Sequence, residues 1–169
     1  RNLENLAELE KLAGCCGIKI FMGSSTGGLL LEDPNDLVRA MQNGHRRVAV
    51  HCEDEPRLRE RKALAEAEGH PRAHPVWRDE QTALIATTRL VNAARDAGRK
   101  VHVLHVTTAD EMAYLADHKD VATVETTPNH LTMFAPDCYE RLGAFAQMNP
   151  PVREKHHQEA IWQAINDGV

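Results

Sequence analysis

The sequence predicts a protein of the α/β class, in which four parallel strands alternate with helices. Two observations predict this class. Short apolar runs rich in Val and Ile recur along the chain, and such runs are typical of buried parallel strands. Segments with the apolar spacing of helices lie between them, and this strict alternation predicts βαβ units. Four such strands are compatible with an open sheet or with part of a barrel.

The first half of the chain contains two of the four strands. We expect, in chain order, a helix over residues 2–13, a strand over 17–22, a helix over 36–43, a strand over 47–52 and a helix over 54–68. Pro34 lies near the start of the second helix, and Gly69 ends the third. Charged residues of both signs around this third helix predict a solvated face; they are Glu53, Asp54, Glu55, Arg57, Arg59, Glu60, Arg61, Lys62, Glu66 and Glu68.

The second half of the chain continues the same alternation. We expect a helix over 79–97, a strand over 100–106, a helix over 109–117, a strand over 121–126 and a helix over 154–167. Gly98 stops the first of these helices, and Thr108 caps the second. Residues 70–75 and the segment after Pro128 read as loops, and paired prolines keep 146–153 extended. The chain starts with a helix and stops just after one, so we expect both ends to be cut from a larger α/β barrel.

Composition and charge favour a soluble cytoplasmic protein. The chain has 169 residues, a formal charge of -5 and no basic patch, which argues against a nucleic-acid partner. No segment approaches about 18 consecutive apolar residues, so we expect no membrane span, and the charged start does not resemble a signal peptide. The four cysteines lack the spacing of a zinc ribbon or a redox pair and read as reduced cytosolic thiols.

Three potential metal-site residues lie in or at the end of the apolar runs: Lys19, His51 and His105. In parallel α/β proteins, chemistry collects at the carboxyl ends of the strands. Two imidazoles from neighbouring strands and a lysine that converge there suggest a metal hydrolase. His102 lies three residues before His105, so strand alternation places it on the opposite face, packed against a helix.

Lys19 is unusual because it lies between Ile18 and Ile20 in a strand that we expect to be buried. Burial favours the neutral amine of lysine. A neutral amine can add carbon dioxide to become a carbamate, whose two oxygens can bridge two metal ions. The alternative is a structural lysine that pairs with a carboxylate such as Glu125.

Five ordered runs carry a family resemblance: 17–27 (Gly-Ile-Lys-Ile-Phe-Met-Gly-Ser-Ser-Thr-Gly), 50–53 (Val-His-Cys-Glu), 103–108 (Val-Leu-His-Val-Thr-Thr), 125–131 (Glu-Thr-Thr-Pro-Asn-His-Leu) and 148–153 (Met-Asn-Pro-Pro-Val-Arg). Together they resemble the cyclic-amidohydrolase branch of the amidohydrolase superfamily, and within it the dihydroorotases of the lysine-carboxylating type. The resemblance runs essentially from end to end. It implies that residues 1–169 are the central part of a metal-dependent (β/α)8 TIM barrel, approximately strands four to seven with their helices, without its N-terminal and C-terminal parts.

The resemblance also implies roles for particular residues. Lys19 would be the carboxylated lysine that bridges two zinc ions, and His51 and His105 would ligate the second zinc. Asn149 stands where dihydroorotases place an asparagine that contacts the substrate. Four further residues would lie near the mouth of the site without assigned roles: Ser24, Ser25, Thr26 and His130.

The implied activity is the reversible opening of a six-membered cyclic amide, which interconverts dihydroorotate and N-carbamoyl-L-aspartate in pyrimidine biosynthesis. The family's His-x-His motif, its substrate-binding arginine and its catalytic aspartate have no counterpart in this sequence. We therefore expect the aspartate beyond Val169 and no turnover by these residues alone. Asp167 precedes the expected eighth strand and is not that aspartate.

Three alternatives remain. Hydantoinases, dihydropyrimidinases and allantoinases share the lysine and both histidines, but hydantoinases tend to place a tyrosine where this chain has Ser24 and usually lack an asparagine before the Pro-Pro pair. A non-catalytic dihydroorotase-like subunit could scaffold aspartate transcarbamoylase, although such proteins tend to lose metal ligands. An α/β domain with incidental histidines would show no convergence of Lys19, His51 and His105. Exposed strand edges make a homo-oligomer or a complex with aspartate transcarbamoylase a further expectation.

Overall fold

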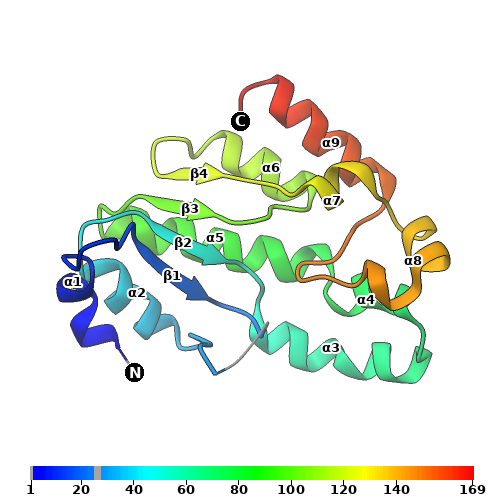
Figure 1. Cartoon of the computed structure of the whole chain (residues 1–169), viewed down its shortest axis with the longest axis horizontal. Coiled ribbons are helices and arrows are strands. Elements are labelled where there is room, and N and C mark those ends of the chain that lie inside the picture. The colour runs from blue at the N-terminus through cyan, green and yellow to red at the C-terminus, as the bar shows by residue number, and fades with distance from the viewer. Residues whose placement is uncertain (1, 25–27) are drawn as a thin grey trace.

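The computed structural model describes residues 2–24 and 28–169. Its strands form one parallel sheet in the order β1-β2-β3-β4, so each crossover adds the next strand on the same side (Figure 1). The bounds are β1 Ile18–Phe21, β2 Val48–His51, β3 Val101–Val103 and β4 Ala122–Val124. The predicted parallel sheet is confirmed, although every strand is shorter than expected because the backbone leaves the sheet before the residues at the strand ends.

Helices connect the strands. Their bounds are η1 Leu3–Asn5, α1 Leu6–Leu9, α2 Pro34–Gln42, α3 Glu55–Glu68, η2 Pro71–Ala73, α4 His74–Trp77, α5 Glu80–Asp96, α6 Ala109–Ala116, α7 Pro128–Thr132, α8 Asp137–Leu142, η3 Gly143–Ala146 and α9 Lys155–Asn166. Among the described residues, no helix is both long enough and apolar enough to cross a membrane.

Side-chain caps determine where the longer helices begin. Asp33, Asp54, Asp79 and Thr108 each precede a helix and accept a hydrogen bond from a backbone N–H in its first turn. These bonds satisfy donors that have no partner within the helix. The predicted cap at Thr108 is confirmed. Asp54 starts α3 only three residues after β2 ends, which leaves a short, constrained link behind His51.

Three segments differ from the expected elements. The first helix ends at Leu9 rather than at residue 13, and the backbone turns at Gly14, whose φ is +83°. Residues 70–75 contain η2 and α4 instead of a loop. The segment after Pro128 forms α7, α8 and η3, because Thr127 caps α7 and proline is favourable in the first turn of a helix. The segment 146–153, expected to be extended, forms no helix from residue 147 onward, but Ala146 still belongs to η3.

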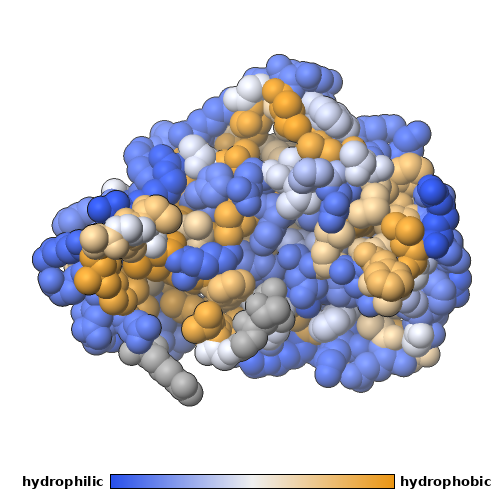
Figure 2. Space-filling view, in the orientation of Figure 1, coloured by the Kyte–Doolittle hydropathy of each residue, from blue (hydrophilic) through white to orange (hydrophobic). Residues whose placement is uncertain are grey.

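The two faces of the sheet differ. Helices lie behind the strands in the view of Figure 1, and the strand residues on that face are fully buried: Val48, Val50, Val101 and Val103. The register aligns another row on the opposite face, composed of Lys19, Ala49, His102 and Thr123. These residues are half-buried or exposed. In Figure 2, hydrophobic and hydrophilic residues are mixed over this side of the molecule.

The prediction for His102 is wrong. It shares the open face of the sheet with Lys19, and it does not pack against a helix. Its Nδ1 lies 2.8 Å from Thr123 Oγ1 and its Nε2 lies 3.2 Å from Glu125 Oε2. The parity argument fails because β3 ends at Val103, so strand alternation does not extend from His102 to His105.

Candidate functional site

The carboxyl ends of β2 and β3 bring two histidines together. His51 is the last residue of β2, and His105 follows β3 by two residues. His51 Nδ1 lies 3.2 Å from His105 Nε2, and the rings meet edge to face with centroids 4.9 Å apart. Two nitrogens that share one tetrahedral zinc at ordinary bond lengths are about 3.3 Å apart. The spacing of this pair therefore fits ligation of one metal ion.

The backbone and the burial of His105 both suit a ligand. Its φ is +40°, in the left-handed region that residues other than glycine rarely adopt. This conformation directs its ring toward His51 rather than along the regular strand. Burial, together with the nearby His51 and Lys19, lowers the pKa of His105 to about 3. The imidazole is therefore neutral near pH 7, the form that binds metal.

Lys19 lies on the same face of the sheet, but it is exposed rather than buried in its strand. Its register partner is Ala49, and Phe21 is paired with His51. Lys19 Nζ lies 4.4 Å from the centroid of the Phe21 ring, which is 6.0 Å from the His51 ring. Phe21 thus links the lysine to the histidine pair.

The expected burial of Lys19 is corrected, yet the predicted direction of its pKa holds. Partial burial lowers the pKa of Lys19, against the opposing effects of Cys52 and Glu125. The alternative of a lysine paired with Glu125 is not what the described residues show, because Glu125 contacts His102 and forms no ion pair with Lys19. The amine is available for modification.

Glu53 and Arg78 lie directly behind His51. Glu53 Oε2 is 2.8 Å from His51 Nε2, at hydrogen-bond distance although the N–H direction is not aligned with it. Glu53 is 0% exposed and Arg78 2%. The expectation of a solvated face is therefore wrong for Glu53, and also for Asp54 and Glu55, which are buried.

The guanidinium of Arg78 keeps the buried Glu53 carboxyl ionised. Arg78 Nε donates to Glu53 Oε1 at 3.0 Å, and Nη2 donates to Oε2. Burial alone would raise the pKa of Glu53, but the contact with His51 and the bonds and charge of Arg78 lower it to about 2. Sequence reasoning did not find this pair. The position of Glu53 two residues after His51 was the available signal.

The loop after β1 is attached to the same pair. Ser24 accepts a hydrogen bond through its carbonyl oxygen from Arg78 Nη2 at 2.8 Å, and its N–H donates to Glu55 Oε2 at 2.7 Å. Ser24 is therefore close to the site, as expected. Ser25 and Thr26, which were expected beside it, lie outside the described residues.

Asn149 belongs to a segment that is tied to α4, between β2 and β3, and to α7, after β4. Its Oδ1 lies 3.2 Å from His74 Nε2, which is also 2.9 Å from the carbonyl oxygen of Met148. Both partners are acceptors, so this nitrogen carries the hydrogen. His130 Nε2 likewise lies 3.1 Å from Pro150 O. Asn149 is thus held through its side-chain oxygen Oδ1, and its neighbours Met148 and Pro150 are held through their backbone oxygens.

Arg153 joins the end of this segment to the site. It is fully buried, and its Nη1 donates to the carbonyl oxygen of Arg78. Its Nε donates to Thr107 Oγ1 at 3.2 Å. The backbone that carries Asn149 is therefore connected to Arg78, although Asn149 itself forms no hydrogen bond with His51 or His105.

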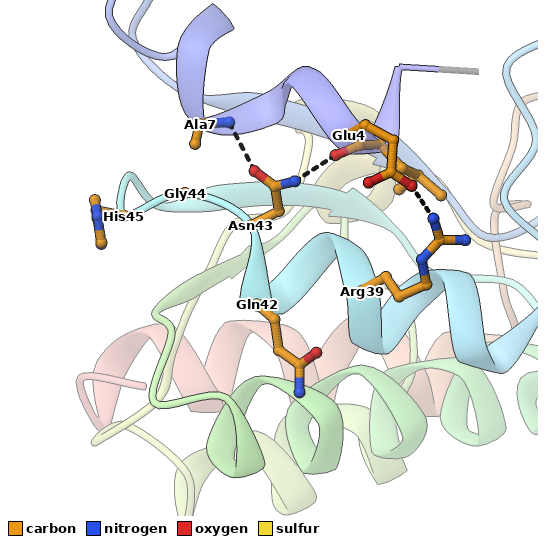
Figure 3. A pocket seen from close by; sticks show the side chains of 8 residues that line it. Glu4, Ala7, Arg39, Gln42, Asn43, Gly44 and His45 are labelled. Carbon is orange, nitrogen blue, oxygen red and sulfur yellow. Dashed lines mark hydrogen bonds and ion pairs between the residues drawn. The ribbon is translucent and has the colours of Figure 1, made fainter.

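The described residues contain no group of three or more His, Cys, Asp or Glu side chains arranged to hold a metal. A hollow of about 410 Å³ lies at the opposite ends of the strands (Figure 3). There Asn43 accepts from Ala7 N at 2.9 Å and donates to Leu3 O at 2.7 Å. These two hydrogen bonds hold η1 and α1 against the end of α2. The candidate site consists instead of the histidine pair with Lys19 nearby.

No family model matches the sequence. Individual curated proteins do. A dihydroorotase of Methanosarcina mazei is 30% identical over 99% of this chain and 39% of its own length. An allantoinase of Deinococcus radiodurans is 32% identical over 97% of this chain and 39% of its own length. The chain thus spans about two fifths of the length of these relatives.

Solved structures agree in fold. A D-hydantoinase is 26% identical, with a TM-score of 0.85 over 98% of this chain and 38% of that chain. The L-hydantoinase of Arthrobacter aurescens has a TM-score of 0.90 over 99% of this chain and 39% of that chain; at 23% identity it supports the fold alone. The predicted α/β fold, with a parallel sheet that forms part of a larger barrel, is confirmed.

Proposed function

We infer a role in cyclic amide hydrolysis from the premise that this chain belongs, over its full length, to the cyclic amidohydrolase branch of the amidohydrolase superfamily. The chain contributes part of a binuclear zinc centre. His51 and His105 would hold one zinc, and Lys19, after carbon dioxide has added to its amine as a carbamate, would supply oxygen ligands to both ions. The observation that carries this proposal is the 3.2 Å approach of His51 Nδ1 to His105 Nε2.

The proposed reaction is that of a dihydroorotase, which interconverts dihydroorotate and N-carbamoyl-L-aspartate in pyrimidine biosynthesis. Support comes from the 30% identity to the dihydroorotase of M. mazei over 99% of this chain. Ser24 in place of the hydantoinase tyrosine and Asn149 before the Pro-Pro pair support it further. The second candidate is an allantoinase, because a relative of that name matches at 32% identity.

The residues have complementary tasks in either reaction. Bound metal would supply Lewis-acid polarisation of the amide carbonyl and a nucleophile from water at neutral pH. His51 and His105 place ring nitrogens next to each other, and the low pKa of His105 keeps its ring neutral, with one nitrogen able to bind metal. The lowered pKa of Lys19 favours the amine that adds carbon dioxide. Asn149 would hydrogen-bond the substrate from the segment that Arg153 and His74 hold in place.

We assign no catalytic acid or base among residues 1–169 and propose that an aspartate beyond Val169 has that role. The partner of the site is a small molecule. A homo-oligomer, or a complex with aspartate transcarbamoylase, would cover the unpaired edges of the outer strands β1 and β4.

The test uses the full natural protein that contains residues 1–169. Dihydroorotate, allantoin and a hydantoin are compared as substrates, and zinc is counted in the same preparation. We expect preferential turnover of dihydroorotate, and loss of both activity and zinc in the Lys19→Ala variant. His118→Ala is a matched control, because the His118 side chain contacts Tyr114, through its carbonyl oxygen and its stacked ring, and no candidate ligand. Full activity and two zinc ions in Lys19→Ala would contradict the bridging role.

A further inference from the structure

The buried pair behind His51 has a geometry that points to a specific task. We propose that Glu53 and Arg78 are positioning residues, which fix the His51 ring with Nδ1 toward the metal position and Nε2 toward protein. The inference rests on the proposed function for the identity of the ligand. It goes beyond it because it names the groups that select the ligating nitrogen.

The two ring nitrogens of His51 have different neighbours. Nδ1 faces His105 Nε2 at 3.2 Å, and Nε2 faces Glu53 Oε2 at 2.8 Å. A neutral imidazole carries its hydrogen on only one nitrogen, and an ionised carboxylate only accepts hydrogen bonds. The negative charge of Glu53, 2.8 Å from Nε2, favours the hydrogen on that nitrogen even though the N–H direction is not aligned with the carboxylate, and this leaves the lone pair of Nδ1 free to bind metal. Carboxylates in this position orient many metal-bound histidines.

Arg78 makes this carboxylate a fixed group. It is 2% exposed and reaches both oxygens of Glu53, through Nε at 3.0 Å to Oε1 and through Nη2 to Oε2. The planar guanidinium matches the plane of a carboxylate, so the pair has one preferred orientation. A lysine at position 78 could balance the charge without fixing the angle.

The surroundings of the pair come from two separate parts of the chain, the segment after β1 and the segment that carries Arg153. The loop after β1 contributes Ser24 O, which accepts from Arg78 Nη2 at 2.8 Å. Arg153 Nη1 donates to Arg78 O. Gly23 lies against Glu53 so closely that a Cβ at position 23 would stand 2.7 Å from Glu53 Cβ. Packing on all sides thus restricts the direction of the Glu53 carboxylate.

A second buried ion pair provides a matched control. Glu10 and Arg99 are each 4% exposed and form an ion pair near the amino end of the sheet. Glu10 Oε2 accepts from the backbone of His45 and Arg46 at 2.7 and 3.1 Å, and it contacts no candidate ligand. A variant of Glu10 therefore reproduces the loss of a buried charge without affecting His51.

The experiment has two readouts on the full natural protein that contains this chain. Nitrogen NMR of the metal-free protein reports which nitrogen of His51 carries hydrogen. Zinc titration reports affinity. We expect hydrogen on Nε2 in the wild type and a mixture of tautomers in Glu53→Gln. Zinc affinity should fall about 10- to 100-fold in Glu53→Gln, the range found when such partners are lost. Glu10→Gln should leave both readouts unchanged.

Glu53→Asp provides a second route if Glu53→Gln does not fold. The shorter side chain keeps the charge opposite Arg78 but withdraws from His51, so zinc affinity should still fall. Hydrogen on Nδ1 of His51 in the wild type would overturn the proposal. Wild-type zinc affinity in Glu53→Gln or Glu53→Asp would also overturn it. A wild-type protein that binds no zinc contradicts the proposed function instead, because the tautomer of His51 is measured without metal.

Discussion

His51 Nδ1 and His105 Nε2 lie 3.2 Å apart, although 54 residues separate the two histidines in the sequence. The parallel register of β2 and β3 places their carboxyl ends side by side, and the positive φ of His105 completes the approach. Each imidazole is placed by its own strand end. The sheet therefore brings the two histidines together.

The first prediction concerns the ligands themselves. His51→Ala and His105→Ala should each lower zinc affinity by more than about 100-fold, because the loss of a direct ligand exceeds the loss of its supporting partner. His102→Ala should remain close to the wild type, since His102 contacts Thr123 and Glu125 instead. Zinc titration of the three variants measures these differences in affinity. Equal losses in all three variants would contradict the assignment.

The second prediction concerns metal removal and carbon dioxide. In the proposed centre, a carbamate would form from carbon dioxide and the neutral amine of Lys19, whose pKa is lowered by partial burial. Protein stripped of metal should regain zinc and activity more completely in bicarbonate buffer than in buffer freed of carbon dioxide. Lys19→Arg should show no such dependence, because a guanidinium stays protonated. If the wild type regained zinc and activity equally well with and without carbon dioxide, the carbamate would be excluded.

The third prediction concerns acid stability. Burial lowers the pKa of His130 to about 4, below its ordinary value of 6.5, so the unfolded chain binds a proton in this window and the folded chain does not. The contribution of neutral His130 to the free energy of unfolding is fully present above pH 6.5. It decreases as the pH falls toward 4, by up to about 3 kcal/mol. Urea midpoints of the metal-free protein measure it. His130→Gln should flatten the slope; an unchanged slope would contradict the assignment.

The fourth prediction concerns Gly23. A Cβ at this position would stand 2.7 Å from both Glu53 Cβ and Glu53 O. Gly23→Ala should therefore destabilise the fold by about 1–3 kcal/mol, as overpacking does, and it should weaken zinc binding by displacing Glu53. Gly28→Ala is the control, because a Cβ at Gly28 meets no atom within 4 Å. Denaturation midpoints and zinc titration that are alike for both variants would show that the close approach is unimportant.

Much of the fold follows from local sequence patterns. The apolar, β-branched runs around residues 48–50 and 101–103 predict buried strands. The structure confirms this, because the side chains that face the helices are fully buried: Val48, Val50, Val101 and Val103. The cap at Thr108 is also a local signal. The short helices α7 and α8 were missed because one or two turns leave little periodicity in the sequence.

The site is harder to predict because its contacts are distant in sequence. The side of the sheet on which His102 lies depends on where β3 ends, which apolar spacing does not reveal. Lys19 is exposed because the described residues leave its face of the sheet uncovered. Glu53 and Arg78 are 25 residues apart and pair only in the folded chain. Among neighbouring charges of both signs, Glu53 looks like a surface residue until its partner is known.

Anomalous X-ray scattering at the zinc edge, from crystals of the full natural protein that contains residues 1–169, tests whether His51 and His105 bind one zinc ion. We expect a zinc about 2.0–2.1 Å from both His51 Nδ1 and His105 Nε2, with density for a carbamate on Lys19. Zinc-replete crystals in which the metal lies elsewhere, or binds His51 through Nε2, would contradict it.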